Sequence, residues 1–117
     1  MKIQVKLFRF GNGKTRVVEI PSIDGTKNEI LEQVFHYGQN MVQPQKGFQS
    51  VSVGDVIFIG GERWIVKNFG FGKLDHETYE ILEKASKISN EGPDDLKHRY
   101  DVVLYNLIGD EAFKLTK

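Results

Sequence analysis

The chain has 117 residues, of which 39% are hydrophobic and 27% charged, as expected for one soluble globular domain with a single core. It contains no cysteine, which excludes disulfide bonds, thiolate catalysis and thiolate metal sites. No run approaches the roughly 18 apolar residues of a membrane helix, so we expect an intracellular protein with no membrane partner.

The charges cancel over the whole chain but not within its two parts. Residues 1–74 carry 10 basic and 6 acidic side chains, whereas residues 75–117 carry 6 basic and 10 acidic ones. Either the two parts neutralise each other in the fold, or the basic part faces an anionic partner such as nucleic acid.

The first predicted element is a β-hairpin whose turn is the Asn-Gly pair at residues 12–13, because this pair readily adopts the positive φ angles of a type I′ turn. A two-residue loop would place Leu7 opposite Val18 and gather the apolar side chains of both strands on one face. The same register sets Arg9 against Arg16. The two guanidinium groups would then either splay apart at the tip or bind an anion.

A helix is predicted to follow from a capping box formed by Thr26 and Glu29, and to end near Tyr37 with Gly38 as its stop. Its buried stripe consists of four apolar residues at helical spacing: Ile30, Leu31, Val34 and Phe35.

Residues 38–50, GQNMVQPQKGFQS, show neither helical nor strand periodicity and contain no acidic residue. Loops of this length are uncommon in compact domains unless they are functional or disordered. We expect Met41, Val42 and Phe48 to keep this one ordered. Its side-chain amides either bond to the loop's own backbone or form a recognition surface with Phe48 as an apolar anchor. These amide residues are Gln39, Asn40, Gln43 and Gln45.

A strand pattern resumes at Val51 and predicts a second hairpin, with strands near residues 56–59 and 63–68. Asp55 is expected to set the turn that begins it. The aromatic and glycine residues at 69–72 are expected to end it.

The remaining segments complete an α+β fold. Asp75 can cap a second helix over roughly residues 76–88, and a last strand is predicted at residues 99–107. The order β-β-α-β-β-α-β predicts a small, mainly antiparallel sheet or partly closed barrel with two packed helices. We expect one domain over residues 1–117, with a core at 1–74 and a helix–strand extension at 75–117. The second helix should bury Ile81, Leu82, Ala85 and Ile88.

The sequence contains no recognisable catalytic or metal-binding motif. His36, His76 and His98 lie in different predicted elements, and none has a neighbour at metal-ligand spacing. The glycine-rich stretches do not match a phosphate-binding loop, and no serine lies in a nucleophile elbow. We therefore expect no cofactor, no metal ion and no catalytic residue. A small enzyme or nucleotide-binding protein is a third hypothesis.

Two segments, residues 6–16 and 63–73, interleave aromatic and basic residues without any acid. Aromatic rings can stack on bases while lysine and arginine bind phosphates, which would suit a nucleic-acid-binding module. In the competing interpretation the rings pack in the core and the cations face water. The residues of this alternative site are Arg9, Arg16, Arg63, Lys67, Lys73, Phe8, Phe10 and Phe71.

The stretch YGQNMVQPQKGFQSVSVGDVI resembles a signature of uncharacterised proteins and domains from bacteriophages and other mobile elements, and is similar to the YodL-like accessory domains. The resemblance covers roughly residues 30–74. Met41 and Val42 stand where the signature usually has an acidic or small residue and then an aromatic one. The resemblance implies a phage or mobile-element origin and no particular reaction.

Small phage accessory proteins often bind a host protein, so the resemblance suggests host takeover or counter-defence in the cytoplasm of a bacterial host cell. The leading hypothesis is a non-enzymatic module that binds a host protein through the amides of residues 39–45 and Phe48. Nucleic acid is the alternative partner. An exposed sheet edge could pair across a two-fold axis, so a monomer and a homodimer are both open.

Overall fold

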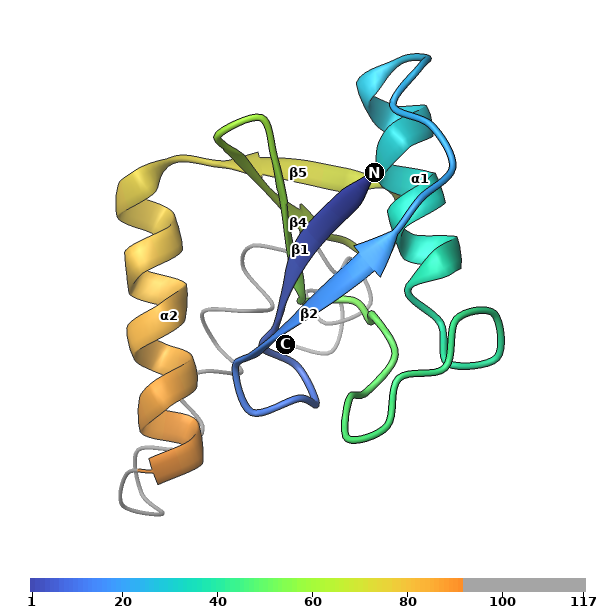
Figure 1. Cartoon of the computed structure of the whole chain (residues 1–117). Helices are drawn as coiled ribbons and strands as arrows, with labels where there is room; N and C mark the ends of the chain where they lie inside the picture. Colours follow the sequence, from blue (N-terminus) through green and yellow to red (C-terminus); the bar gives the residue numbers. More distant parts are fainter. Residues whose placement is uncertain (92–117) are drawn as a thin grey trace.

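The computed structural model describes residues 1–91, with side chains as far as Lys87. In this part of the chain five antiparallel strands form one sheet that lies between two helices (Figure 1). Within residues 1–91 the strand order is β2-β1-β3-β4-β5, so β2 and β5 are the edges of this described sheet and it does not close into a barrel. The predicted α+β class is confirmed. The elements are β1 (Lys2–Leu7), β2 (Lys14–Glu19), α1 (Lys27–Tyr37), β3 (Val56–Ile59), β4 (Glu62–Val66), β5 (Phe71–Leu74) and α2 (His76–Glu91).

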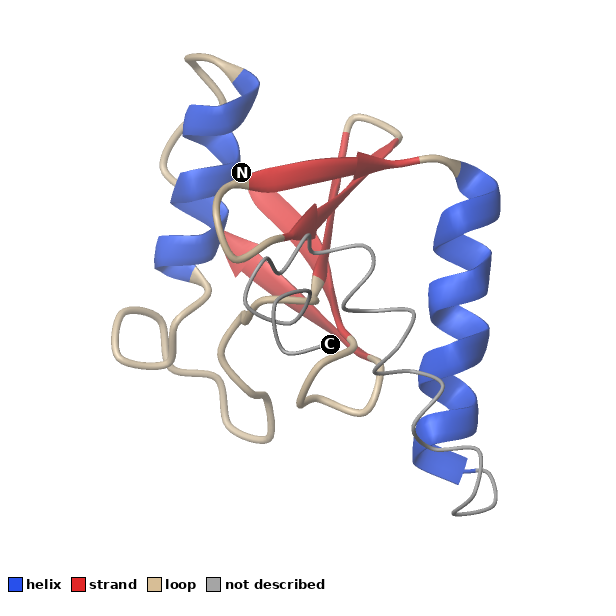
Figure 2. Ribbon diagram, turned by 180° about the vertical axis from the view of Figure 1, so that it is seen from behind, coloured by secondary structure: helices blue, strands red, loops and turns tan. Residues whose placement is uncertain are grey.

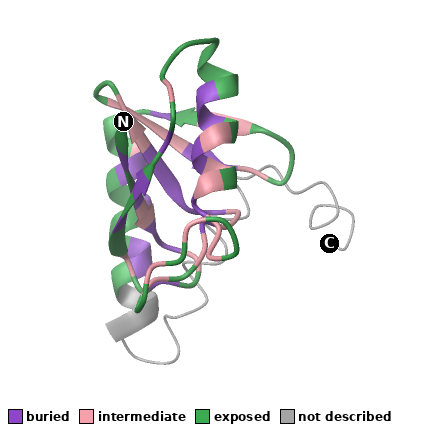
Figure 3. Ribbon diagram, turned by 45° about the vertical axis from the view of Figure 1, so that its right-hand side comes forward, coloured by how far each residue is buried: buried purple, intermediate pink, exposed green. Residues whose placement is uncertain are grey.

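Each face of the sheet has its own hydrophobic core, because α1 covers one face and α2 covers the other (Figure 2). Successive strand residues point to opposite faces, so neighbouring apolar residues can both be buried. Buried residues therefore follow the strands and the inner sides of the helices (Figure 3). The α1 core contains Ile3, Val5, Leu7, Val18, Ile20, Ile30, Leu31, Val34, Val51, Ile57 and Val66. The α2 core contains Phe8, Val56, Ile65, Leu74, Tyr79, Leu82 and Ala85.

The first hairpin forms with a different register from the one predicted. Leu7 pairs with Lys14, and Val18 pairs with Ile3, so residues 8–13 form the loop and the predicted two-residue turn is wrong. The shift along the strand is an even number of residues, so the same side chains still share a face. The predicted grouping of Val5, Leu7 and Val18 on one face is therefore confirmed.

Tertiary contacts explain the longer loop. The Phe8 side chain is buried in the α2 core, and the Arg9 N–H donates to Oδ1 of Asp55 at 2.8 Å. The Phe8 N–H donates to the Lys6 carbonyl at 3.1 Å, so neither this N–H nor that of Arg9 is available to extend the ladder. Asn12 and Gly13 do adopt positive φ angles of 54° and 76°, as the Asn-Gly pair predicts, and the Gly13 N–H donates to the Leu7 carbonyl.

The beginning and end of α1 follow the prediction, although its stop has a different cause. The capping box is present: the Glu29 N–H donates to Oγ1 of Thr26, and the Thr26 N–H donates to Oε1 of Glu29, both at 3.2 Å. Gly38 has a φ of −78°, so it does not supply a left-handed cap. It is needed for space, because a Cβ there would collide with the Val51 side chain and lie 2.8 Å from the Val34 carbonyl oxygen.

The aromatic and glycine residues after β4 form a turn instead of ending the hairpin. The Lys67 N–H donates to the Gly70 carbonyl at 3.0 Å, and Gly70 has a φ of 78°. The chain reverses there into β5, which pairs with β4. The sequence did not predict β5, because its four residues include a glycine and are too few to show the alternation of a strand. The strand predicted at residues 99–107 lies outside the described residues.

Asp75 caps α2 as predicted, since its Oδ1 accepts from the Thr78 N–H at 2.7 Å. The inner face of the helix is formed by Tyr79, Leu82, Ala85 and Ser86, all buried. Ile81 was expected on that face but is 50% exposed, because it lies two residues after Tyr79 and so points to the other side of the helix. Ile88, which was expected there too, lies outside the residues whose side chains are described. No helix in the described part of the chain is long and apolar enough to cross a membrane.

Candidate functional site

The amide-rich loop, residues 38–50, connects α1 to the segment before β3 and lies beside the edge strand β2. The Glu19 N–H donates to Oε1 of Gln43, and Nε2 of Gln43 donates back to the Glu19 carbonyl, both at 2.9 Å. Nε2 of Gln45 donates to the Val17 carbonyl at 2.6 Å. A carboxamide has the same donor and acceptor as a peptide group. The two glutamines therefore take the place of a neighbouring strand along this part of the β2 edge.

Arg16 holds the same loop from beneath. Its side chain is fully buried, and Nη1 donates to Oδ1 of Asn40 at 2.7 Å and to the Gln49 carbonyl at 2.9 Å. Nη2 donates to the Gln43 carbonyl. Burial lowers the pKa of the guanidinium, but an arginine stays charged in proteins. The predicted pairing of Arg16 with Arg9 is wrong, because Arg16 lies opposite Val5 and bonds to the loop.

The first two amides fasten the beginning of the loop to its end. Nε2 of Gln39 donates to the Phe35 carbonyl at 2.8 Å and to the Val51 carbonyl at 2.9 Å. Nδ2 of Asn40 donates to the Phe48 carbonyl at 2.9 Å. All four predicted amides are thus bonded within the chain. Only the bond from Asn40 to Phe48 reaches the loop's own backbone, as one alternative expected, whereas the other three amides bond to backbone outside the loop. Their contact with a partner stays a prediction.

The apolar residues of the loop separate into an inner one and an outer pair. Phe48 is half-buried and packs against the α1 core, with Nζ of Lys14 5.9 Å from its ring centroid. Met41 is 99% exposed and Val42 is also exposed. The expectation that this pair keeps the loop ordered is therefore wrong. Sequence reasoning did not select Met41 and Val42 as site residues.

The tip that carries these side chains is nevertheless firmly built. The Val42 N–H donates to the Gln39 carbonyl at 2.9 Å, and the Gln43 N–H donates to the same oxygen at 2.8 Å. The Asn40 N–H donates to Oγ of Ser50 at 2.8 Å. The tip therefore presents two apolar side chains from a backbone whose position is set by hydrogen bonds.

The structure does not bring the alternative nucleic-acid residues together. Phe8 is buried under α2, whereas Arg16 is buried on the opposite face of the sheet. Phe71 packs against the α1 core. Two further cations are engaged within the chain, since Cζ of Arg63 lies 4.6 Å from the Tyr79 ring centroid and Nζ of Lys73 lies 2.9 Å from Oε2 of Glu62.

The other members of that set lie around the first hairpin loop and the turn after β4. Phe10 is 62% exposed, and Cζ of Arg9 lies 5.4 Å from its ring centroid. Lys67 is half-buried in the turn. The two aromatic residues of the first hairpin loop therefore differ, since Phe8 packs in the α2 core whereas Phe10 is exposed.

Asp55 joins the first hairpin loop to the turn before β3. It is buried, its Oδ1 accepts from the Arg9 N–H, and its Oδ2 accepts from the Ser52 N–H, both at 2.8 Å. Burial raises the pKa of this carboxyl to about 7, and the backbone hydrogen bonds oppose that rise. Its predicted role in the turn is confirmed by the bond from its own N–H to the Ser52 carbonyl.

No group of three or more histidine, aspartate or glutamate side chains within residues 1–91 is arranged to hold a metal ion. Comparison with known proteins gave no match: no family model fits the sequence, and no curated protein or solved structure is significantly similar to it. The resemblance to phage proteins therefore stays a prediction, and any function has to be argued from the chain itself.

Proposed function

We propose that this chain is a non-enzymatic module that binds a protein through the tip of the amide-rich loop. The observation that carries the proposal is the 99% exposure of Met41 at the tip of a loop held by Arg16, Gln39 and Gln43. The amides in this interpretation position the recognition residues and do not themselves need to face the partner.

The rigidity of the tip is what separates Met41 from an ordinary exposed side chain. Single apolar residues on a surface are common and need no explanation. A flexible loop, however, loses conformational entropy when it binds, whereas a loop already fixed by its own hydrogen bonds loses less. Burying a methionine side chain contributes about 1.5–3 kcal/mol. Met41 and Val42 together can therefore form the apolar centre of a small interface.

The surroundings of the tip suggest the chemistry of the partner. The loop contains no acid, and it carries the exposed Lys46, while Nζ of Lys14 donates to the Gly47 carbonyl at 3.3 Å. Glu19 is the nearby acid, and the N-terminal ammonium lies 3.5 Å from it. These charges favour a partner with an apolar pocket and acidic groups at its rim. The phage resemblance makes a cytoplasmic protein of the bacterial host the class to test first.

The test compares two charged substitutions at equally exposed apolar residues. Met41→Asp places a carboxylate at the tip, and Phe69→Asp makes the same kind of change at a residue that is 91% exposed in the turn before β5. Each immobilised variant and the wild type is incubated with bacterial lysate, and the captured proteins are compared by mass spectrometry. We expect one protein captured by the wild type and by Phe69→Asp to be lost with Met41→Asp.

Binding through the loop would be refuted if only Phe69→Asp lost the captured protein, or if the wild type and both variants captured the same proteins equally. Both substitutions lie at exposed sites, so urea unfolding should show that each variant keeps its fold. Captured nucleic acid that is released by raised salt would instead favour the alternative partner. The scattered positions of its proposed contacts give that alternative less support.

A further inference from the structure

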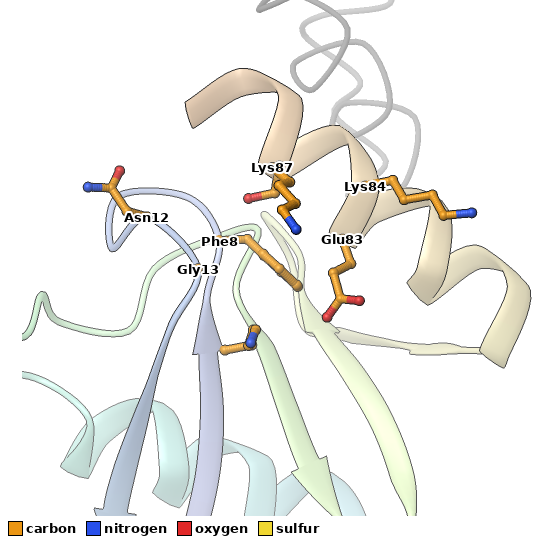
Figure 4. Close-up of a pocket in the computed structure, with 8 residues that line it drawn as sticks. Phe8, Asn12, Gly13, Glu83, Lys84 and Lys87 are labelled. Atoms are coloured by element: carbon orange, nitrogen blue, oxygen red, sulfur yellow. The ribbon is translucent and has the colours of Figure 1, made fainter. Parts of the chain in front are cut away.

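A second feature, on the other side of the molecule from the amide-rich loop, is a partly open cavity. It has a volume of about 390 Å³ and lies between the first hairpin loop and α2 (Figure 4). Its walls come from Lys6 of β1, from residues 12–13 of the loop, and from one side of α2. The buried Phe8 forms part of its lining. This volume is within the range of about 300–1,000 Å³ that is typical of ligand sites.

The charges around the pocket are mainly positive. Three lysines line it, one from β1 and two from α2: Lys6, Lys84 and Lys87. Figure 4 shows the Lys87 ammonium on the side of α2 that faces Phe8, whereas the Lys84 side chain extends away from the pocket. Lys6 and Lys87 thus bring positive charge from two separate elements to one cavity.

Among the described residues that line the pocket, Glu83 is the one with a carboxylate. Its Oε2 accepts from the Tyr79 hydroxyl at 3.1 Å, so this carboxylate already has a donor from its own helix. Burial and the neighbouring Glu83 raise the pKa of Tyr79 to about 12, which keeps the hydroxyl protonated and able to donate. This hydrogen bond orients the Glu83 carboxylate but does not cancel its charge, so the two lysines must outweigh it for an anion to bind.

We propose that this pocket binds a small phosphate monoester, with Lys6 and Lys87 contacting the phosphate and the Phe8 side of the cavity contacting the organic group. Lys6 and Lys87 outnumber Glu83 among the charged groups that face the cavity, which favours an anionic ligand, and ammonium groups bind phosphate oxygens through strong charge-assisted hydrogen bonds. The volume exceeds that of a phosphate group alone, which leaves room for an apolar substituent. This site is independent of the tip of the amide-rich loop.

Titration of the ¹⁵N-labelled full chain with inorganic phosphate and with phenyl phosphate tests the proposal by NMR. We expect saturable shifts of the amides in residues 12–13 and 83–87, with phenyl phosphate binding more tightly than phosphate. Lys6→Gln and Lys87→Gln should each weaken phenyl phosphate binding about tenfold, as expected for one lost charge-assisted contact. The control Lys46→Gln removes an exposed lysine of the amide-rich loop and should leave the affinity unchanged.

Shifts that do not saturate, or equal affinities for Lys87→Gln and Lys46→Gln, would overturn the proposed site. Tighter binding of phosphate than of phenyl phosphate would overturn the part assigned to the Phe8 side. Lys6 is half-buried, so the amide spectrum of Lys6→Gln should be checked for an intact fold. Lys87 is exposed, and its variant tests the proposal even where the Lys6 variant unfolds.

Discussion

Arg16→Lys is the substitution that most directly tests how the amide-rich loop is held. The Arg16 guanidinium donates from two nitrogens to three oxygens, on Asn40, Gln43 and Gln49. Lysine keeps the positive charge but has one nitrogen on a flexible stem, so it can keep at best one of these bonds in the same geometry. Arg16→Lys therefore tests the number and direction of the hydrogen bonds while it keeps the positive charge.

The expected loss follows from the two bonds that lysine cannot make. A hydrogen bond to a charged group contributes about 1.5–3 kcal/mol, so the free energy of unfolding should fall by about 3 kcal/mol at the lower end of that range. For a domain of this size that corresponds to a fall in Tm of about 12 °C. The oxygens left without a donor lie against a fully buried side chain, so water cannot readily replace it.

Urea unfolding followed by the fluorescence of Trp64, the single tryptophan, measures the global loss. Trypsin cleavage after the exposed Lys46 reports on the loop itself and should accelerate in the variant. Arg63→Lys is the matched control, since lysine can keep a cation over the Tyr79 ring, and it should cost less than about 1 kcal/mol. A loss in Arg16→Lys no larger than in this control, with unchanged cleavage, would refute the assigned role of Arg16.

Two further changes test buried contacts that follow the amide-rich loop or begin it. Burial raises the pKa of Asp55 from 3.8 to about 7, so between these pH values the unfolded chain releases a proton that the folded chain retains. The free energy of unfolding should therefore fall by on the order of 4 kcal/mol as the pH rises through this window. Asp55→Asn should remove that dependence on pH. If urea unfolding gives the same change of free energy with pH for both proteins, the assignment to Asp55 is contradicted. Gly38→Ala should destabilise the chain by about 2 kcal/mol, because its Cβ would meet Val51 and the Val34 carbonyl. Gly72→Ala is its control in the same urea assay, since the atom nearest to its Cβ would be Cδ of the flexible Lys67 side chain, at 3.0 Å, and equal losses would refute the packing argument.

The features that could be read from the sequence are those made by residues close together in the chain. The Thr26–Glu29 capping box, the Asp75 cap and the positive φ of Asn12 each depend on atoms within a few residues of one another. The grouping of Leu7 with Val18 on one face also holds, because side chains alternate along any strand. These local rules were enough to predict an α+β fold with two helices and an antiparallel sheet.

Contacts between distant parts of the chain decided the hairpin register and the partners of the loop amides, which local rules left open. The Asn-Gly turn permits the predicted register, but burial of Phe8 under α2 and the bond from Arg9 to Asp55 favour the longer loop. The amides of the loop could have faced a partner or the chain. Their bonds to Arg16 and to the β2 edge span 24 or more residues of sequence, and no pattern within the loop specifies them.

The candidate site shows the same division. Its segment was found from the sequence, because a long polar loop without charge runs or periodicity is unusual in a compact domain. The exposed residues of the segment could not be found in this way, because the side chains that point outward depend on what the rest of the loop bonds to. Arg16 and the β2 edge draw the amides inward, and Met41 is consequently left exposed.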